Sequence, residues 1–408
     1  MCRQTLSRNL LAALLVVMFN LAMTPIASAR DEQSEPSRAG TSIQKPPPGF
    51  PKPSSRKSHT MGKKIARDLA RFNRTVTIST DHPITVFPEG VGFDDLQEAF
   101  SFCSRKKWDG KAGSRQWSYL VLQPGIYVGN YNFPENTVVI GDAGPMATLI
   151  VGATGTNEPA LKAAAPSGPT LTEFALVGIG VIGRAVAGLT YTGTNAHSDL
   201  YIENCLIYAD ASQATPAIGM VGSGYGMDQE FEMIVVRTDI ESALDAACAA
   251  QIGDYADVEI AGCEVFGYTL AMDIQGSGST ESGIDVYDSL LEGEDSLEPA
   301  INVIDVNWLT IHDCEIEAAG GGDAVYYSGS FGGVLERCEI YSESGDGVEL
   351  NAISWFEMSY NKISAWDPSA RAVWLTNSAY AYLYYTGLNA TTDIDADSTS
   401  GYTLTYCH

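Results

Sequence analysis

The chain has 408 residues, of which 24 are Lys or Arg and 50 are Asp or Glu, so its formal net charge at pH 7 is −26. Hydrophobic residues make up 45% of the chain, enough to bury a sizeable core, which excludes a largely disordered protein. A chain this acidic repels polyanions, which excludes nucleic acid and anionic membrane surfaces as favoured partners.

The N-terminus has the features of an export signal. Arg3 and Arg8 precede an apolar run over residues 10–23, and Ala27-Ser28-Ala29 places small residues where a signal peptidase reads them. We therefore expect a signal peptide over residues 1–29 and a secreted protein, extracellular or periplasmic. A membrane anchor is the alternative, but a run of about 14 residues is short for a bilayer, and no later stretch predicts a membrane span.

Three further segments follow the signal. Residues 30–60 are rich in Pro and Ser, which predicts a disordered linker without a core. Residues 61–80 predict a short basic helix and a lead-in, interpreted as a solvated helix that caps the fold. Residues 81–408 predict one domain, and from residue 119 onward the chain has 6 basic and 40 acidic residues.

The main signal in this domain is a repeat of about 25 residues. Nine anchor positions recur at intervals of 23 to 33 residues, and the residues two positions after and three positions before each anchor are always apolar. The segments between anchors alternate with period two and are broken by Gly, Asp, Asn and Ser, which predicts short strands. The anchors are Ile179, Cys205, Thr238, Cys263, Ser289, Cys314, Cys338, Asn361 and Thr386.

A short all-β repeat of this length predicts a parallel β-helix, in which each turn stacks on the next at about 4.8 Å. Anchors that are small and polar, or cysteine, fit a tight inward turn where they hydrogen-bond successive backbones. We interpret the anchor cysteines as core residues, while a bridge between Cys314 and Cys338 on adjacent turns remains open.

The start of this domain resembles the right-handed parallel β-helix superfamily, also called pectin-lyase-like, and pectin methylesterases in particular. The carriers are the amphipathic segment Phe93–Phe100, then Tyr119–Tyr127, Val138–Gly144 and Thr148–Val151. The resemblance implies an all-β, right-handed solenoid with an N-terminal capping helix, and carbohydrate as the usual substrate class. It does not supply catalytic residues, because the short catalytic motifs of pectin methylesterases and polygalacturonases are absent.

A third strand in each turn follows the pattern Ala or Gly, apolar, variable, apolar. Because side chains alternate along a strand, the variable residue points outward and forms a column along the solenoid. The expected column consists of Gly219, Asp245, Asp273, Asn302, Tyr326, Glu349 and Trp374.

Carboxylates, amides and aromatic rings together are typical of a glycan groove, and a solvated acidic face is the alternative interpretation. Asp245 and Asp273 are the candidate catalytic acid and base, expected on adjacent turns, where close like charges bind a proton or calcium. Asn302, Tyr326, Glu349 and Trp374 are the candidate substrate-binding residues.

Two functions remain open at this point. The first is a secreted solenoid that binds a polysaccharide or a cell-surface glycan, or forms part of a surface layer, without a recognisable catalytic motif. The second is a polysaccharide-active enzyme that uses Asp245 and Asp273. The strongly acidic body favours a neutral glycan, or a contact that calcium bridges.

Overall fold

The structure is a computed structural model that describes residues 84–86, 96–105, 118–184, 186–194, 196–210, 215–223, 231–243, 249–253, 257–276, 283–294, 297–306, 308–329, 332–377 and 379–407. The chain divides into two compact units, Met1–Pro51 and Lys52–His408, and every described residue belongs to the second. The expected signal peptide, linker and basic helix lie outside the described residues, as does Asp245.

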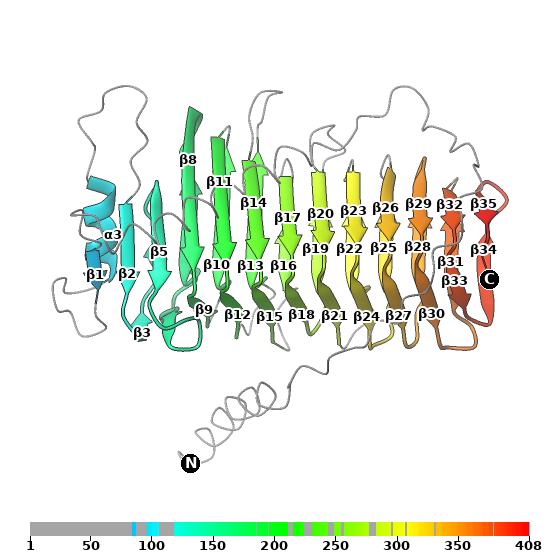
Figure 1. The fold of residues 1–408 in the computed structure, drawn as a ribbon, viewed down its shortest axis with the longest axis horizontal. Helices are drawn as coiled ribbons and strands as arrows, with labels where there is room; N and C mark the ends of the chain where they lie inside the picture. The colour runs from blue at the N-terminus through cyan, green and yellow to red at the C-terminus, as the bar shows by residue number, and fades with distance from the viewer. Residues whose placement is uncertain are drawn as a thin grey trace, which may run out of the picture. The chain divides into compact units, whose positions relative to one another are not determined.

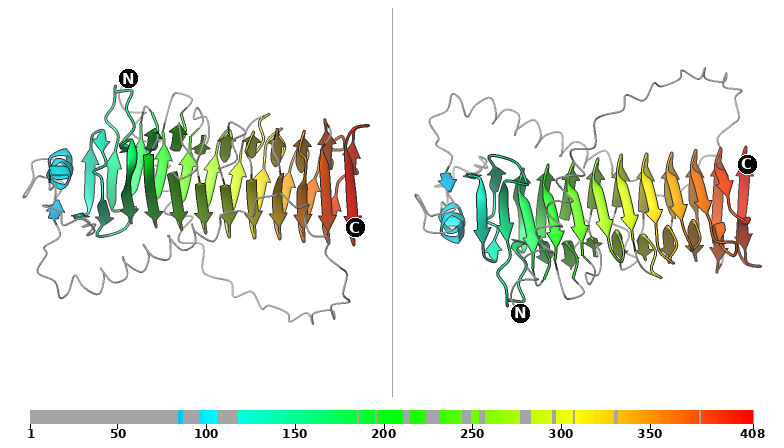
Figure 2. Two further views of the ribbon diagram at one scale, coloured as in Figure 1. Left: turned by 90° about the horizontal axis from the view of Figure 1, so that it is seen from above. Right: turned by 90° about the horizontal axis from the view of Figure 1, so that it is seen from below.

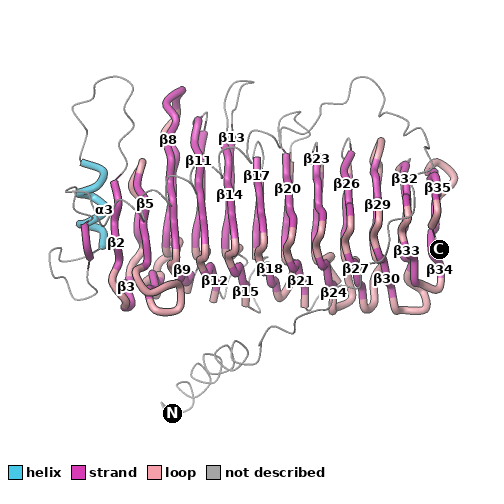
Figure 3. Tube along the Cα trace, in the orientation of Figure 1, coloured by secondary structure: helices cyan, strands magenta, loops and turns pink. Residues whose placement is uncertain are grey.

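The described residues form a parallel β-solenoid, as the repeat predicts (Figures 1 and 2). Its strands belong to three sheets, and the chain visits the first, second and third sheet in turn before it begins the next coil. Each strand pairs in parallel with the equivalent strand of the neighbouring turns, so the strands lie in ranks along the long axis (Figure 3).

The strand bounds follow the three-sheet order along the chain. The first sheet contains β1 (Ile84–Val86), β2 (Ser118–Leu122), β5 (Thr137–Gly141), β8 (Gly168–Val177), β11 (Ala196–Glu203), β14 (Phe231–Val236), β17 (Asp257–Ala261), β20 (Gly283–Tyr287), β23 (Trp308–His312), β26 (Gly332–Glu336), β29 (Phe356–Ser359), β32 (Tyr380–Tyr384) and β35 (Gly401–Thr405). The second sheet contains β3 (Gly125–Val128), β6 (Thr148–Val151), β9 (Gly180–Gly183), β12 (Leu206–Ala209), β15 (Asp239–Ser242), β18 (Glu264–Gly267), β21 (Leu290–Gly293), β24 (Glu315–Ala318), β27 (Glu339–Ser342), β30 (Lys362–Ala365) and β33 (Gly387–Asn389). The third sheet contains β4 (Tyr131–Asn132), β7 (Leu161–Ala165), β10 (Leu189–Thr194), β13 (Ile218–Ser223), β16 (Ala250–Ile252), β19 (Met272–Gln275), β22 (Ile301–Ile304), β25 (Val325–Ser328), β28 (Val348–Asn351), β31 (Arg371–Thr376) and β34 (Thr392–Ala396).

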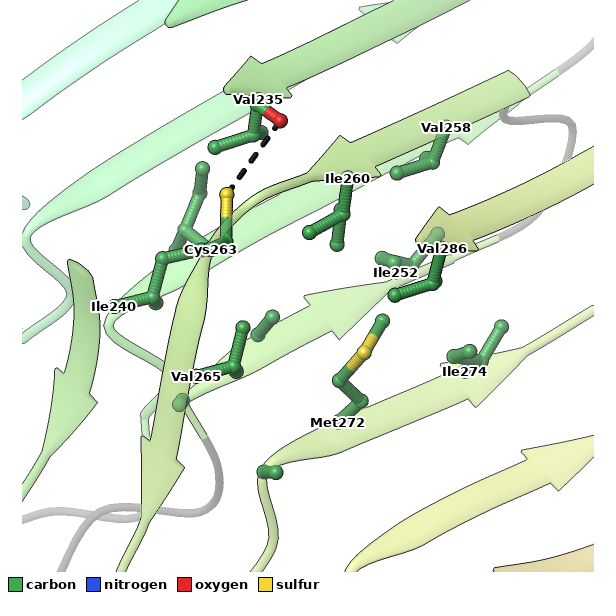
Figure 4. Close-up of a cluster of buried hydrophobic side chains, with 14 of the residues drawn as sticks. Val235, Ile240, Ile252, Val258, Ile260, Cys263, Val265, Met272, Ile274 and Val286 are labelled. Carbon is green, nitrogen blue, oxygen red and sulfur yellow. Dashed lines mark hydrogen bonds between the residues drawn. The ribbon is translucent and has the colours of Figure 1, made fainter. Parts of the chain in front are cut away.

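The core lies between the three sheets and is built from aliphatic ladders. Ile207, Ile240, Val265 and Leu291 occupy the same register on successive strands of the second sheet, and each is at most 1% exposed. Figure 4 shows how side chains from all three sheets meet in this interior. The expected stacking of the repeat is therefore confirmed.

A tight corner joins the first sheet to the second in every turn from β8 onward. One residue of this corner has a positive φ, a conformation in which only glycine is free of strain. The residue that follows is the buried anchor. The corner residues that precede the nine anchors are Gly178, Asn204, Arg237, Gly262, Asp288, Asp313, Arg337, Tyr360 and Tyr385.

The anchors bond the backbone of neighbouring turns, as expected. The Thr238 hydroxyl accepts a hydrogen bond from the backbone N–H of Cys205 at 3.3 Å, and the Cys263 thiol donates to the Val235 carbonyl at 3.5 Å (Figure 4). Burial raises the pKa of Cys205 to about 12 and of Cys263 to about 11, so both thiols stay protonated and inert. The described cysteines are all free, including Cys314 and Cys338.

The helix α3 (Leu96–Arg105) covers the N-terminal end of the solenoid, as predicted from the Phe93–Phe100 pattern (Figure 1). Leu96, Ala99 and Phe100 are buried in the core, and the Phe100 ring packs 6.1 Å from the ring of Tyr131. No helix among the described residues is both long and apolar enough to span a lipid bilayer.

Candidate functional site

The outward column that the sequence predicts runs along the third sheet. Asp273 pairs with Asn302, Asn302 with Tyr326, Tyr326 with Glu349, and Glu349 with Trp374, each on the next strand along the axis. The alternation of buried and less buried residues on β22, β25 and β28 shows that the column side chains face away from the core.

The expected column is wrong at one turn. The strand between β13 and β19 is β16, and it places Gln251 beside both Gly219 and Asp273. The predicted strand that began at Ala243 would have placed Asp245 there. The neighbour of Asp273 on that strand is therefore the amide Gln251, while Asp245 lies outside the described residues.

Asp273 is instead held by amides. Its Oδ2 accepts hydrogen bonds from Gln251 Nε2 at 3.3 Å and Gln275 Nε2 at 3.0 Å, and its Oδ1 accepts one from Asn302 Nδ2 at 2.9 Å. The residue is 9% exposed. Both oxygens of Asp273 thus accept hydrogen bonds from amides within the sheet, which fixes the orientation of the carboxylate.

Three carboxyl groups meet further along the same sheet, between β25 and β31. Oxygen atoms of Asp323, Asp346 and Glu349 all lie within 4.8 Å of one another. Asp323 and Asp346 directly precede the third-sheet strands of two successive turns, and the Asp323 carboxylate accepts a hydrogen bond from the backbone N–H of Asp346 at 2.7 Å. Glu349 joins them from the outward column of β28.

Arg371 balances part of this negative charge. Its Nε and Nη2 atoms lie 3.1 Å and 2.9 Å from the two carboxylate oxygens of Asp346, which is 4% exposed. Its guanidinium carbon lies 3.6 Å from the centre of the Trp374 ring, a cation–π contact. The Arg371 backbone N–H also donates to Asp346, at 2.6 Å.

The cluster sets the protonation of Glu349. Burial and the negative charge of Asp323 raise the pKa of Glu349 to about 8, even though Arg371 acts in the opposite direction. Burial also raises the pKa of Asp323. At neutral pH, Glu349 therefore holds a proton and can donate a hydrogen bond or the proton itself. Oxygen ligands of this kind suit a hard cation, but Arg371 and the proton on Glu349 already neutralise much of the charge.

A chain of hydrogen bonds extends the site along the sheet. Asn351 Nδ2 donates to the Tyr326 hydroxyl oxygen at 3.2 Å, and Asn377 Nδ2 donates to Asn351 Oδ1 at 2.8 Å. Tyr326, Glu349 and Trp374 are half-buried, so each keeps some surface for a ligand. The structure thus brings three of the four predicted binding residues together, with Asn302 committed to Asp273.

Sequence reasoning missed Asp323 and Asp346, and it gave Arg371 no role in this site. The signal was present, because Gly322-Asp323-Ala324-Val325, Gly345-Asp346-Gly347-Val348 and Ala370-Arg371-Ala372-Val373 align in the repeat. These residues lie three positions before the outward column. Simple alternation along a strand places residues at odd offsets on opposite faces, so alternation alone does not bring these residues to Glu349.

No family model matches the chain, and no curated protein matches it in sequence. Among solved structures, it is similar to the A-module of mannuronan C-5 epimerase AlgE4 from Azotobacter vinelandii, with 13% identity, 78% of this chain and 96% of that chain covered, and a TM-score of 0.42. It is also similar to a pectin methylesterase from carrot, with 14% identity, coverage of 80% and 89%, and a TM-score of 0.35. The surface protein and adhesin PfbA from Streptococcus pneumoniae has 10% identity, coverage of 79% and 99%, and a TM-score of 0.39. These likenesses concern the parallel β-helix fold alone.

Proposed function

We propose that this protein is secreted and binds a polysaccharide along the third sheet, with Glu349, Arg371 and Trp374 at the centre of the site. The observation that carries the proposal is the contact of the Arg371 guanidinium with Trp374, beside a protonated Glu349. An indole ring packs against a sugar ring, while carboxyl and guanidinium groups hydrogen-bond its hydroxyls. The export-signal pattern of residues 1–29 supports secretion.

The ligand is expected to be a neutral polysaccharide, or an acidic one that calcium bridges. Residues 119–408 contain only six basic residues, and Arg371 already pairs with Asp346. A free polyanion would therefore meet repulsion along the sheet.

A glycan array tests the proposal, with the wild-type protein and the variants Trp374→Ala and Glu349→Gln, each with calcium and with a chelator. Removal of a central aromatic anchor is expected to weaken binding by about tenfold or more. Tyr385→Ala is the matched control, because Tyr385 is 48% exposed at a corner between the other two sheets. Binding that survives both third-sheet variants would contradict the proposal.

The protonated Glu349 also favours a second candidate function, hydrolysis of a glycosidic bond. Glu349 shares a hydrogen bond with Asp323, which is closer than the separation of about 5 Å between the two carboxyl groups of a retaining glycosidase, so only Glu349 is assigned a role, that of general acid. Glu349 would donate the proton to the leaving oxygen, and a water molecule would attack the anomeric carbon. Release of reducing ends from a bound glycan, lost in Glu349→Gln, would support this function. If a bound glycan stays intact, only the binding function is supported.

A further inference from the structure

The outward face of the first sheet is rich in aromatic rings from β23 to β35. β23 and β32 alternate strictly, so that every second side chain points away from the core. The outward positions of the last five strands are mainly aromatic, hydroxylic or acidic, and they hold one aliphatic residue and no Lys or Arg. They are Trp308, Thr310, His312, Gly332, Val334, Glu336, Glu357, Ser359, Tyr380, Tyr382, Tyr384, Gly401, Thr403 and Thr405.

Two tryptophans on this face stack across a glycine. The Trp308 and Trp355 ring centres are 5.6 Å apart with planes inclined by 19°. Gly332 lies on the strand between them, and a Cβ there would lie 2.7 Å from the Trp355 carbonyl oxygen and 3.2 Å from its ring. The missing side chain at Gly332 therefore lets the two half-buried indoles approach and stack on each other.

Tyrosines continue this surface along the axis. Tyr382 lies 6.2 Å from Trp355 and 5.0 Å from Tyr380, measured between ring centres. Tyr380 is 36% exposed, and its hydroxyl shares a hydrogen bond of 2.8 Å with Thr403. We call Trp308, Trp355, Tyr380 and Tyr382 the aromatic row. The aromatic row therefore extends along the axis from β23 to β32, the direction in which an extended sugar chain would lie.

The polar groups beside the aromatic row select the kind of ligand. Glu336 and Glu357 point outward on neighbouring strands, and burial raises the pKa of Glu357, with the nearby Glu336 charge as a further cause. Carboxylates and hydroxyls accept hydrogen bonds from sugar hydroxyls. The carboxylates also repel acidic groups.

We propose that the aromatic row is a second carbohydrate-binding face, which takes an uncharged polysaccharide of pyranose units. It shares no residue with the third-sheet site, and the two faces belong to different sheets. The proposal therefore goes beyond the proposed function and does not depend on it.

Affinity electrophoresis tests this with the full chain in gels that contain hydroxyethylcellulose, galactomannan or dextran. We expect retardation by at least one of these uncharged polymers, and a loss of about tenfold or more in affinity for Trp308→Ala and for Tyr380→Ala. Carboxymethylcellulose, the acidic counterpart of hydroxyethylcellulose, should retard the protein less. Trp366→Ala is the matched control, because Trp366 is 67% exposed at the corner between β30 and β31.

The outcomes separate this proposal from the third-sheet site. Circular dichroism first checks that each variant is folded, and Tyr380→Ala, at a more exposed ring, guards against a folding defect in Trp308→Ala. Loss in both first-sheet variants, with binding retained in Trp374→Ala, supports the aromatic row. No retardation in any uncharged gel overturns it. Loss of binding in Trp374→Ala alone also overturns it and leaves the proposed function standing. Binding of a protein partner at the aromatic row, in place of a polysaccharide, likewise overturns it.

Discussion

Glu349 shows how neighbouring side chains decide the chemistry of one carboxyl group. An exposed glutamate is ionised at neutral pH, whereas burial and the nearby Asp323 raise the pKa of Glu349 to about 8. The Arg371 guanidinium lies close by but is directed at Asp346, so it offsets only part of this effect. Glu349 thus becomes a proton donor because of contacts with residues outside the outward column, which the column pattern does not predict.

This pKa gives stability a defined pH dependence. Between the ordinary value of 4.5 and about 8, Glu349 binds more protons in the folded state than in the unfolded chain. Its contribution to the free energy of unfolding is therefore complete below pH 4.5 and is lost as the pH rises through 8. Urea unfolding of the wild type and of Glu349→Gln at pH 5, 7 and 9 should show a smaller decline in the variant.

Glu135→Gln is the control for this experiment, because Glu135 is exposed in the loop between β4 and β5. That variant should follow the wild-type profile. Parallel profiles for wild type and Glu349→Gln would show that Glu349 is ionised in the folded protein across this range.

At the scale of the strand, the sequence predicts which residues face inward better than it predicts which strand is used. The ladders with Ile207 and Val265 follow from alternation alone, because a shift by one residue would expose every apolar side chain. Ala243-Leu-Asp-Ala and Ala249-Ala-Gln-Ile both fit the third-strand pattern, however. Pairing with β13 and β19 selects the second segment, and four residues of local sequence do not contain that information.

The capping helix offers a test at this scale. Leu96 and Phe100 of α3 are each 1% exposed and cover the end of the solenoid, where an uncovered strand edge would pair with another molecule. Phe100→Asp should therefore produce oligomers or aggregates under conditions in which the wild type stays dispersed, measured by light scattering after size exclusion. Phe102→Asp, at a ring that is 40% exposed on the same helix, should leave the size distribution unchanged.

At the scale of the whole molecule, the negative charge is concentrated by the stacking itself. The second sheet places Asp239 beside Glu264 and Glu315 beside Glu339, so like charges face each other on adjacent strands. The charge of Glu264 adds to burial in raising the pKa of Asp239. Each exposed pair of this kind costs about 1 kcal/mol in water at close range.

Salt should relieve this repulsion. Raising NaCl from 20 mM to 1 M shortens the screening distance to about 3 Å, so the melting temperature is expected to rise by several degrees. The double variant Glu315→Gln, Glu339→Gln removes one facing pair and should show a smaller rise. A melting temperature independent of salt in both proteins would contradict a destabilising role for the acidic ladders.

The corner between the first and second sheets keeps the same positive-φ backbone conformation with different residue types. Five types of residue appear there, namely Gly, Asn, Asp, Arg and Tyr, while the buried residue after each one keeps the bend closed. The corner is therefore a ridge along which charge, size and aromaticity can change independently of the interior. Substitutions at this edge can therefore change the residues exposed to solvent in one turn at a time, with little effect on the packing of the core.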